Sequence, residues 1–186
     1  MKIFLDTANI DLIKKYNDMG LVDGITTNPT LLSKEKGNPG EIMRQIVKIV
    51  KGPVSLEVVS TNADVMLEES HRLKKYGPNV VVKIPMIPDG LKVVKKLKSE
   101  GIETNVTLVF SANQAILAAK AGAAYVSPFI GRLDDAGQDG MALIREIVQI
   151  FKNYEFDTKV LVASVRHPLH VIDAAKIAAH VVTLPP

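Results

Sequence analysis

The sequence predicts a (β/α)8 barrel, or TIM barrel, formed as a single domain by residues 1–186. Short segments rich in β-branched residues alternate with longer segments of helical periodicity, and no linker interrupts the alternation. Successive strands begin about 25 residues apart on average, which is the length of a short βα unit. The eight predicted strands are Ile3–Asp6, Gly24–Thr27, Val54–Val58, Val80–Ile84, Glu103–Leu108, Tyr125–Ser127, Lys159–Ser164 and Val181–Leu184.

A doubly wound open sheet is the alternative fold for such a pattern. That fold usually carries a glycine-rich turn after its first strand, whereas Asp6-Thr7-Ala8-Asn9 stands there in this chain. The sequence stops at Pro186, two residues beyond the last predicted strand. We therefore expect a barrel that lacks its final C-terminal helix, and either a longer functional chain or a neighbouring subunit that covers the last strand.

The segments between the strands have the pattern of amphipathic helices. In one of them Leu91, Val94 and Leu97 recur at helical spacing, and four lysines occupy the other positions. A solvated lysine face is the preferred interpretation, and a polyanion site is the alternative. Helix ends are indicated by Asn62 and Ser111 as N-caps and by Gly122 as a C-cap.

Composition excludes several classes of protein. Hydrophobic residues make up 47% and charged residues 23% of the chain, which is typical of a globular protein and not of a disordered one. No apolar run is long enough for a transmembrane helix, and a carboxylate follows the N-terminal Met1–Leu5 too early for a signal peptide. A net charge of +3 with 5% aromatic residues gives no sign of a nucleic-acid partner.

The absence of cysteine excludes disulfides, thiolate metal sites and cysteine nucleophiles, and a reducing cytoplasm is the expected location. His167 and His170 lie one helical turn apart, but no third ligand accompanies them. No phosphate-binding glycine loop or serine nucleophile motif is present. We therefore expect neither a metal nor a cofactor.

Polar residues at the strand ends are the candidates for chemistry, because the active site of such a barrel lies at the C-terminal ends of its strands. Period-2 alternation predicts which of them point inward. By this rule Asp6 shares a face with Phe4, and Lys83 shares one with Val81. The same rule pairs Glu57 with Ser55, Asn105 with Thr107, and Ser164 with Val162.

Lys83 is the most unusual of these residues, because it interrupts the apolar strand Val80–Ile84. A buried ammonium must find a carboxylate or lose its proton, and the neutral amine can form a Schiff base with a carbonyl substrate. The alternative is a structural ion pair with Asp6 or Glu57. In the first interpretation these two carboxylates carry protons, and in the second they are counter-ions.

The remaining candidates fall into two groups. Asn28, Asn105 and Thr107 are able to bind substrate hydroxyls or a catalytic water, or only to close turns at the strand ends. Arg132, Ser164 and Arg166 follow the sixth and seventh strands, and Pro168 predicts the start of a helix beside them. Guanidinium groups at a helix N-terminus form a suitable phosphate site, and surface ion pairs are the alternative for both arginines.

Five segments of the sequence together resemble the small transaldolases, a family that includes the fructose-6-phosphate aldolases. The resemblance extends over the whole chain, and its segments are Phe4–Ala8 (FLDTA), Gly24–Thr30 (GITTNPT), Val82–Pro85 (VKIP), Thr104–Ser111 (TNVTLVFS) and Tyr125–Arg132 (YVSPFIGR). It implies a metal-free (β/α)8 enzyme that moves a dihydroxyacetone unit from a ketose phosphate to an aldose phosphate. The implied pathway is the non-oxidative pentose phosphate pathway.

The resemblance also implies a role for each matching residue. Lys83 forms the Schiff base, Asp6 handles the proton of the hydroxyl at the cleaved bond, and Glu57 with Thr107 holds the catalytic water. The residues implied to bind the substrate are Asn28 and Asn105 for the dihydroxyacetone hydroxyls, Arg132, Ser164 and Arg166 for the phosphate, and Ser127 and Phe129 beside them.

Two positions distinguish the two activities in the family. Transaldolases resemble this chain in having Glu57 and Phe129, where the fructose-6-phosphate aldolases have Gln and Tyr. A lyase that releases dihydroxyacetone and a sugar-phosphate binding protein remain the alternatives. Family members also have helices beyond the eighth strand that contact neighbouring subunits, so the resemblance implies a ring-like homo-oligomer, a pentamer or a decamer.

Overall fold

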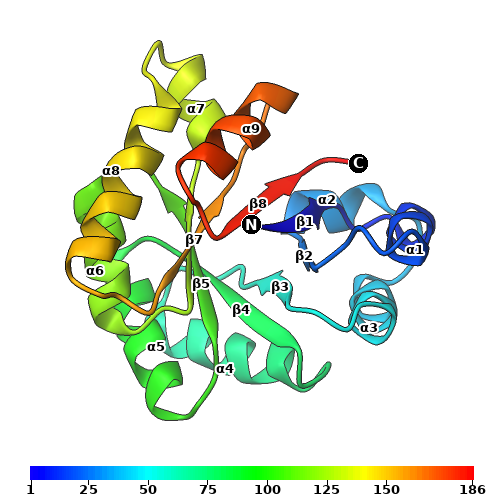
Figure 1. Ribbon diagram of the computed structural model, residues 1–186. Coiled ribbons are helices and arrows are strands. Elements are labelled where there is room, and N and C mark those ends of the chain that lie inside the picture. The colour runs from blue at the N-terminus through cyan, green and yellow to red at the C-terminus, as the bar shows by residue number, and fades with distance from the viewer.

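The computed structural model describes residues 1–186 and has eight parallel strands that close into a barrel in the order β1 to β8. Figure 1 shows helices arranged around these strands. The strands are β1 (Lys2–Asp6), β2 (Gly24–Thr26), β3 (Val54–Glu57), β4 (Val80–Pro85), β5 (Thr104–Val109), β6 (Tyr125–Pro128), β7 (Lys159–Val162) and β8 (Val181–Leu184). The predicted barrel is therefore confirmed, and the alternative of an open sheet is wrong.

Nine helices lie between the strands, so that most βα units contain one and two units contain two. They are α1 (Ile10–Asp18), α2 (Pro29–Lys34), α3 (Pro39–Ile49), α4 (Ala63–Lys74), α5 (Pro88–Ser99), α6 (Ala112–Ala121), α7 (Ile130–Asp135), α8 (Gly140–Asn153) and α9 (Pro168–Lys176). None of them has both the length and the apolar character needed to cross a membrane.

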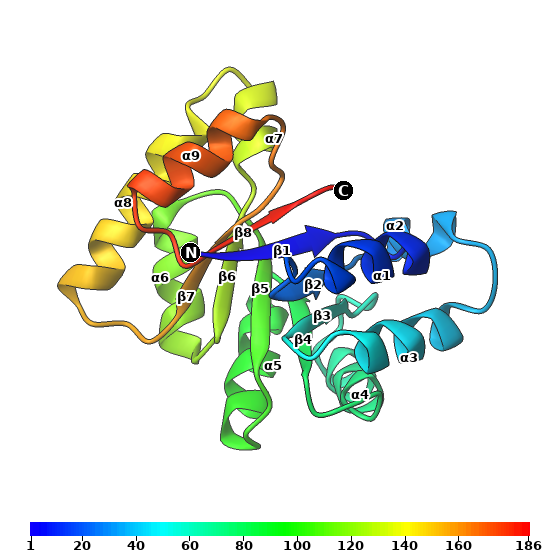
Figure 2. The same ribbon diagram turned by 45° about the vertical axis from the view of Figure 1, so that its right-hand side comes forward.

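The barrel closes where β8 pairs with β1, with Leu5 in register with Leu184. No helix follows β8 within the 186 residues, as predicted. In Figures 1 and 2 the C-terminal end of the chain continues beyond β8 and lies between α9 and α2.

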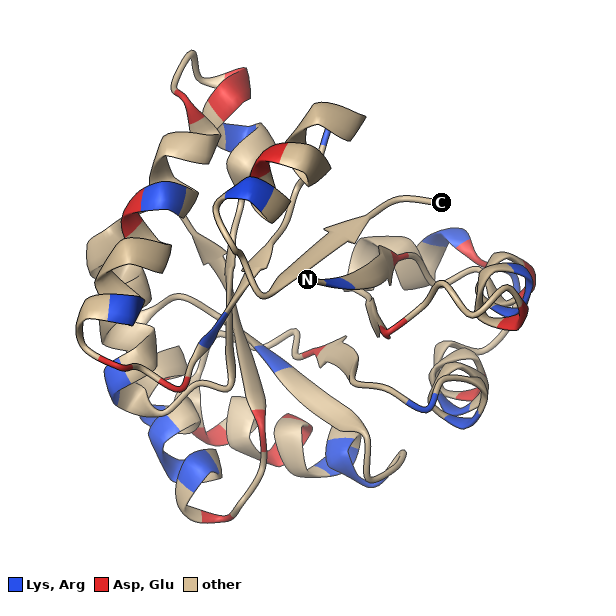
Figure 3. Ribbon diagram, in the orientation of Figure 1, with Lys and Arg blue, Asp and Glu red and all other residues tan.

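Local sequence explains the ends of several helices. The side chains of Asn62 and Ser111 accept hydrogen bonds from the first turns of α4 and α6, and Gly122 ends α6 with a φ of 95°. In α5, Val94 and Leu97 are fully buried, whereas its lysines lie on the exposed face. Figure 3 shows the same general arrangement, with most charged residues on the helices and loops outside the barrel. These predictions are confirmed.

The core consists of layers on both faces of the sheet. Two apolar clusters pack between the strands and the helices, and a third, smaller cluster fills the barrel itself. This inner cluster contains Phe4, Val81, Tyr125, Leu161, Ala163 and Val181. Because alternate residues of a strand share a face, the next inward position on four of these strands lies two residues further on. Those positions carry Asp6, Lys83, Ser127 and Thr183, so the barrel interior changes from apolar to polar toward the C-terminal ends of the strands.

The inward face of β7 differs from the prediction. Leu161 and Ala163 lie inside the barrel, whereas Val162 packs among the residues beneath the helices. The strand ends at Val162, and Ser164 adopts a left-handed backbone conformation with a φ of 62°. This turn breaks the alternation, so pairing Ser164 with Val162 on one face was wrong.

Candidate active site

A cavity of about 300 Å³ opens at the C-terminal ends of the strands and contains most of the predicted site. It is lined by eight of the eleven predicted site residues, which are Asp6, Asn28, Lys83, Ser127, Phe129, Arg132, Ser164 and Arg166. Thr26 and Thr183 also line it. Segments from both ends of the sequence therefore meet in one cavity, as the barrel topology predicts.

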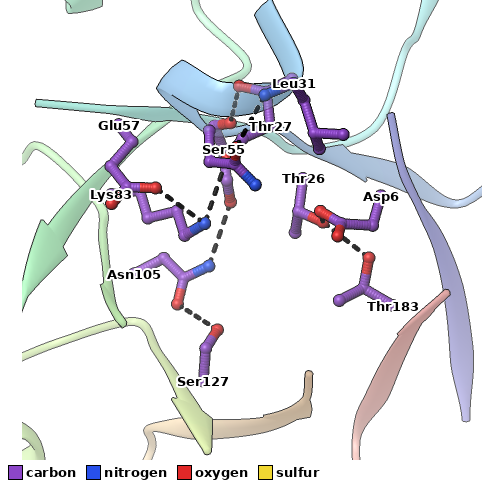
Figure 4. A network of polar contacts seen from close by, with 11 residues as sticks. Asp6, Thr26, Thr27, Leu31, Ser55, Glu57, Lys83, Asn105, Ser127 and Thr183 are labelled. Atoms are coloured by element: carbon purple, nitrogen blue, oxygen red, sulfur yellow. Dashed lines mark hydrogen bonds and ion pairs between the residues drawn. The ribbon is translucent and has the colours of Figure 1, made fainter. Parts of the chain in front are cut away.

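Lys83 lines this cavity and is only 5% exposed. Its Nζ atom lies 2.9 Å from Oε2 of Glu57 and donates a hydrogen bond of 3.1 Å to the carbonyl oxygen of Thr27. Figure 4 shows the Lys83 and Glu57 side chains pointing toward each other from neighbouring strands. The predicted contact between Lys83 and a carboxylate is thus present, and the carboxylate is Glu57 and not Asp6.

Asp6 is held by a different set of partners. The hydroxyl of Thr26 donates a hydrogen bond of 2.7 Å to Oδ1 of Asp6, and the same hydroxyl lies 2.6 Å from Oγ1 of Thr183. All three residues point into the barrel from the adjacent strands β1, β2 and β8 (Figure 4). Asp6 and Lys83 therefore face the same cavity from separate hydrogen-bond networks.

Asn105 belongs to a third network beside Lys83. The hydroxyl of Ser127 donates a hydrogen bond of 2.7 Å to Oδ1 of Asn105, whose Nδ2 donates one of 3.2 Å to Oγ of Ser55. Asn105 is fully buried. These bonds fix the orientation of the amide, with its oxygen toward β6 and its nitrogen toward β3.

Asn28 and Thr107 differ in how their polar atoms are used. Oδ1 of Asn28 accepts a hydrogen bond of 2.8 Å from the backbone N–H of Leu31 and so caps α2. Its Nδ2 has no partner in the protein and belongs to a residue that lines the cavity. Thr107 is buried and does not line the cavity, and its hydroxyl has no partner in the protein.

Arg132 and Arg166 both line the cavity, but they have different partners. Nη2 of Arg166 lies 2.6 Å from Oδ2 of Asp135, and both side chains are about half exposed. Arg132 forms no ion pair or hydrogen bond through its side chain. The alternative of a surface ion pair thus describes Arg166 in this structure and does not describe Arg132.

Gly131 allows the segment around Arg166 to lie against α7. Its backbone N–H donates to the carbonyl oxygen of Ser164. A Cβ atom at this position would overlap that carbonyl oxygen and would lie 2.6 Å from Nε of Arg166. The missing side chain therefore permits the close approach of the two segments that carry the arginines.

His170 fixes the backbone of the same segment from α9. Its Nδ1 accepts a hydrogen bond of 3.3 Å from the backbone N–H of Arg166, and its Nε2 lies 3.3 Å from Oδ2 of Asp134. Burial lowers the pKa of His170, and the nearby His167 lowers it further, while Asp134 acts in the opposite direction. The neutral ring can accept the hydrogen bond at Nδ1, whereas the charged ring cannot.

Three residues of this site were not predicted from the sequence: Thr26, Thr183 and His170. Strand alternation would have found the two threonines, because Thr183 follows the inward Val181 by two residues and Thr26 is in register with Asp6. For His170 the only signal was its spacing from His167, and the two rings are indeed close, with centroids 3.7 Å apart and planes tilted by 38°.

Several known proteins are similar to this chain over its whole length. Residues 3–186 match the model of the transaldolase/fructose-6-phosphate aldolase family. A probable transaldolase of Nitrosopumilus maritimus is 71% identical over all of this chain and 84% of its own length. Probable transaldolases of Thermoplasma volcanium and Aquifex aeolicus are 62% and 60% identical, again over all of this chain and over 84% and 85% of their lengths. The chain belongs to the transaldolase/fructose-6-phosphate aldolase family.

Proposed function

We propose that this protein is a transaldolase that transfers a dihydroxyacetone unit from a ketose phosphate to an aldose phosphate through a Schiff base on Lys83. The donor is fructose 6-phosphate or sedoheptulose 7-phosphate, and the pathway is the non-oxidative pentose phosphate pathway. The observation that carries the proposal is the burial of the Lys83 amine against Glu57, at the edge of a cavity that also contains Asp6.

The ion pair gives Lys83 a route to its reactive form. The ammonium transfers a proton to Oε2 of Glu57, which lies 2.9 Å away, and leaves a neutral amine. The amine attacks the C2 carbonyl of the ketose, and the resulting carbinolamine loses water to give an iminium ion. Glu57 returns the proton to the departing hydroxyl. The unpartnered buried hydroxyl of Thr107 supports its role in holding this water.

Asp6 acts in the next step, in which the carbon chain is cleaved. Its carboxylate takes the proton of the C4 hydroxyl, the C3–C4 bond breaks, and the electron pair moves through C2 to the iminium nitrogen. The products are a free aldose phosphate and an enamine on Lys83. Attack of this enamine on a second aldose phosphate reverses the steps and completes the transfer.

Other residues in and beside the cavity orient the substrate. The Nδ2 atom of Asn28 and the side chain of Ser127, which line the cavity, and Asn105, which is buried next to Ser127, bind the hydroxyls of the dihydroxyacetone unit. Arg132, Ser164 and Arg166 bind the phosphate, with the first turn of α9 beside them. Arg166 exchanges its partner Asp135 for the phosphate, whereas Arg132 has no partner to give up.

The main alternative is a lyase that releases dihydroxyacetone by hydrolysis of the intermediate. Release requires protonation of the enamine and attack of water on the iminium ion. Phe129 lines the cavity without adding a hydroxyl to it, which favours transfer over release. A binding protein is less well supported, because binding alone requires no proton carrier beside Lys83.

The test compares transfer with release. We expect fructose 6-phosphate and erythrose 4-phosphate to give sedoheptulose 7-phosphate much faster than fructose 6-phosphate alone gives dihydroxyacetone. Borohydride added with the donor should leave a covalent mass increase on the peptide that contains Lys83. Lys83→Ala should abolish both signals, and Lys34→Ala, a matched control outside the cavity, should retain them. If dihydroxyacetone is released as fast as the transfer proceeds, the protein is a lyase and not a transaldolase.

A further inference from the structure

We propose that Thr183 is a positioning residue for Asp6: its hydroxyl orients Thr26 so that Oδ2 of Asp6 is the oxygen that takes the substrate's proton. This proposal rests on the proposed function, because it concerns the carboxylate assigned to C3–C4 cleavage. Thr183 lies on β8, and its side chain forms a hydrogen bond to Thr26. It forms none to Lys83 or to any other residue that was given a role in the proposed function.

Three oxygen atoms form a short chain near the place where β8 and β1 close the barrel. Oγ1 of Thr26 lies 2.7 Å from Oδ1 of Asp6 and 2.6 Å from Oγ1 of Thr183. Both threonines are at most 3% exposed. The chain joins the second strand of the barrel to the first and the last (Figure 4), so backbone pairing on both sides of β1 holds it in place.

Counting hydrogen atoms fixes the direction of this chain. A carboxylate only accepts hydrogen bonds, so Thr26 must donate its single hydroxyl hydrogen to Asp6. Thr26 then has only lone pairs to offer Thr183, which must be the donor in the second bond. The opposite arrangement would place lone pairs of Thr26 2.7 Å from the carboxylate oxygen. Thr183 therefore selects the one orientation of Thr26 that stabilises the ionised Asp6.

The two oxygens of Asp6 thereby acquire different roles. Oδ1 is engaged by Thr26, while Oδ2 forms no hydrogen bond within the protein, and Asp6 lines the cavity. The C4 hydroxyl proton accordingly goes to Oδ2. Hydrogen bonds in series strengthen one another, so the bond from Thr183 also strengthens the bond from Thr26 to Asp6. Loss of the Thr183 hydroxyl removes the second anchor of the Thr26 hydroxyl and weakens the bond that orients the carboxylate.

The test uses Thr183→Val, which keeps the shape of the side chain, and Thr183→Ser, which keeps the hydroxyl. We expect Thr183→Val to lower kcat for fructose 6-phosphate with erythrose 4-phosphate by about tenfold. This is less than the roughly 10²- to 10⁴-fold that an acid–base group itself contributes, because Asp6 is still present. KM should change by less than about twofold, because the hydroxyl does not bind substrate. Thr183→Ser should retain at least about half of the wild-type kcat.

A partial reaction separates this role from general damage to the site. Dihydroxyacetone has no C4 hydroxyl, so forming its Schiff base on Lys83 does not use Asp6 as the proposed base. Borohydride should trap the dihydroxyacetone adduct equally fast in the wild type and in Thr183→Val. Thr183→Ala, which adds no bulk, serves the same purpose if the valine variant does not fold.

Several results would overturn the proposal. These are a wild-type kcat in Thr183→Val, a serine variant as impaired as the valine variant, or a loss of adduct formation parallel to the loss of turnover. A wild-type protein that forms no adduct at all would instead remove the proposed function, and this role with it. The two failures are therefore distinguishable.

Discussion

The pairing of Lys83 with Glu57 is more informative about chemistry than about stability. Replacing a buried ion pair by apolar residues of similar size is often neutral or stabilising, because removing two charges from water is costly. β4 is otherwise apolar, and its other residues from Val80 to Ile84 are buried. An amine and a carboxylate 2.9 Å apart in such surroundings therefore favour a function that uses proton exchange between them.

The two arginines of the cavity should contribute unequally to phosphate binding. Arg132 has no partner in the protein, whereas Arg166 must give up its contact with Asp135. A charge-assisted hydrogen bond contributes about 1.5–3 kcal/mol, which corresponds to roughly 10- to 150-fold. We expect Arg132→Ala to raise KM for fructose 6-phosphate within this range and Arg166→Ala to raise it less. Steady-state kinetics measures both.

Unphosphorylated substrate provides the control for these variants. Trapping of dihydroxyacetone on Lys83 should be unchanged in both, because it involves no phosphate. Arg145→Ala on α8, where the arginine pairs with Asp139 outside the cavity, should leave both measurements unchanged. Equal losses with phosphorylated and unphosphorylated substrates would contradict the phosphate assignment.

At the scale of the elements, strand alternation predicted the site wherever a strand remains regular. The eight predicted strands agree with the observed ones to within two residues at each end. Asp6 and Lys83 point inward as predicted, because each follows an inward residue by two positions, and Asn105 points inward to Ser55 and Ser127. Ser164 was placed on the wrong face because its left-handed backbone cannot be read from periodicity.

Contacts between segments that lie far apart in the sequence could not be predicted from the sequence pattern. The partner of Arg166 is Asp135, which lies 31 residues earlier at the end of α7. Likewise, the choice of Glu57 over Asp6 as partner of Lys83 depends on strand register, which places Glu57 directly opposite Lys83. Such choices follow from the closed barrel and not from any single segment.

The start of α7 offers a test of how one element supports the phosphate site. In Gly131→Ala the new Cβ overlaps the carbonyl oxygen of Ser164 and approaches Nε of Arg166. Both contacts require the segment between β7 and α9 to move. We expect the free energy of unfolding to fall by about 1–3 kcal/mol and KM for fructose 6-phosphate to rise. Denaturant titration and steady-state kinetics measure the two effects.

Gly40→Ala is the matched control, because Gly40 also occupies the second position of a helix, α3. A Cβ there meets no backbone atom outside its helix. Its nearest neighbours are Oδ1 of Asn38, which caps α3, and the hydroxyl of Tyr76, both at 3.0 Å, so these side chains need to shift by only a few tenths of an ångström. We expect little change in stability or KM. If both alanine variants behave alike, the close packing of Gly131 does not support the phosphate site.

At the scale of the whole molecule, the fold separates a stable apolar layer from a reactive polar one. The inner cluster around Phe4 and Tyr125 fills the barrel below the cavity. Polar residues from seven of the eight strands surround the cavity or lie next to its lining: Asp6, Thr26, Glu57, Lys83, Asn105, Ser127 and Thr183. One layer can therefore hold the strands rigidly, while the other carries the polar side chains of the candidate site.

Two histidines outside this polar layer connect the pH of the solution to the stability of the barrel. Nδ1 of His180 accepts a hydrogen bond of 3.1 Å from the backbone N–H of Val160, at the start of β7. Nδ1 of His170 accepts the corresponding bond from Arg166. Each bond requires a ring nitrogen without a proton. Burial is the main cause that lowers the pKa of both histidines, and Lys159 lowers that of His180 further.

The sign of the resulting pH dependence follows from these directions. In the unfolded chain a histidine has a pKa of about 6.5, so on acidification it binds a proton before the folded protein does. Stability from His170 and His180 is therefore fully present above about pH 6.5 and is lost as the pH falls through their lower folded-state pKa values. We expect the free energy of unfolding, measured with denaturant, to fall as the pH is lowered below about 6.5. In a His170→Asn/His180→Asn variant the amide oxygens can accept the same bonds without titrating, so this slope should become shallower. An unchanged slope in the variant would show that other groups cause the loss.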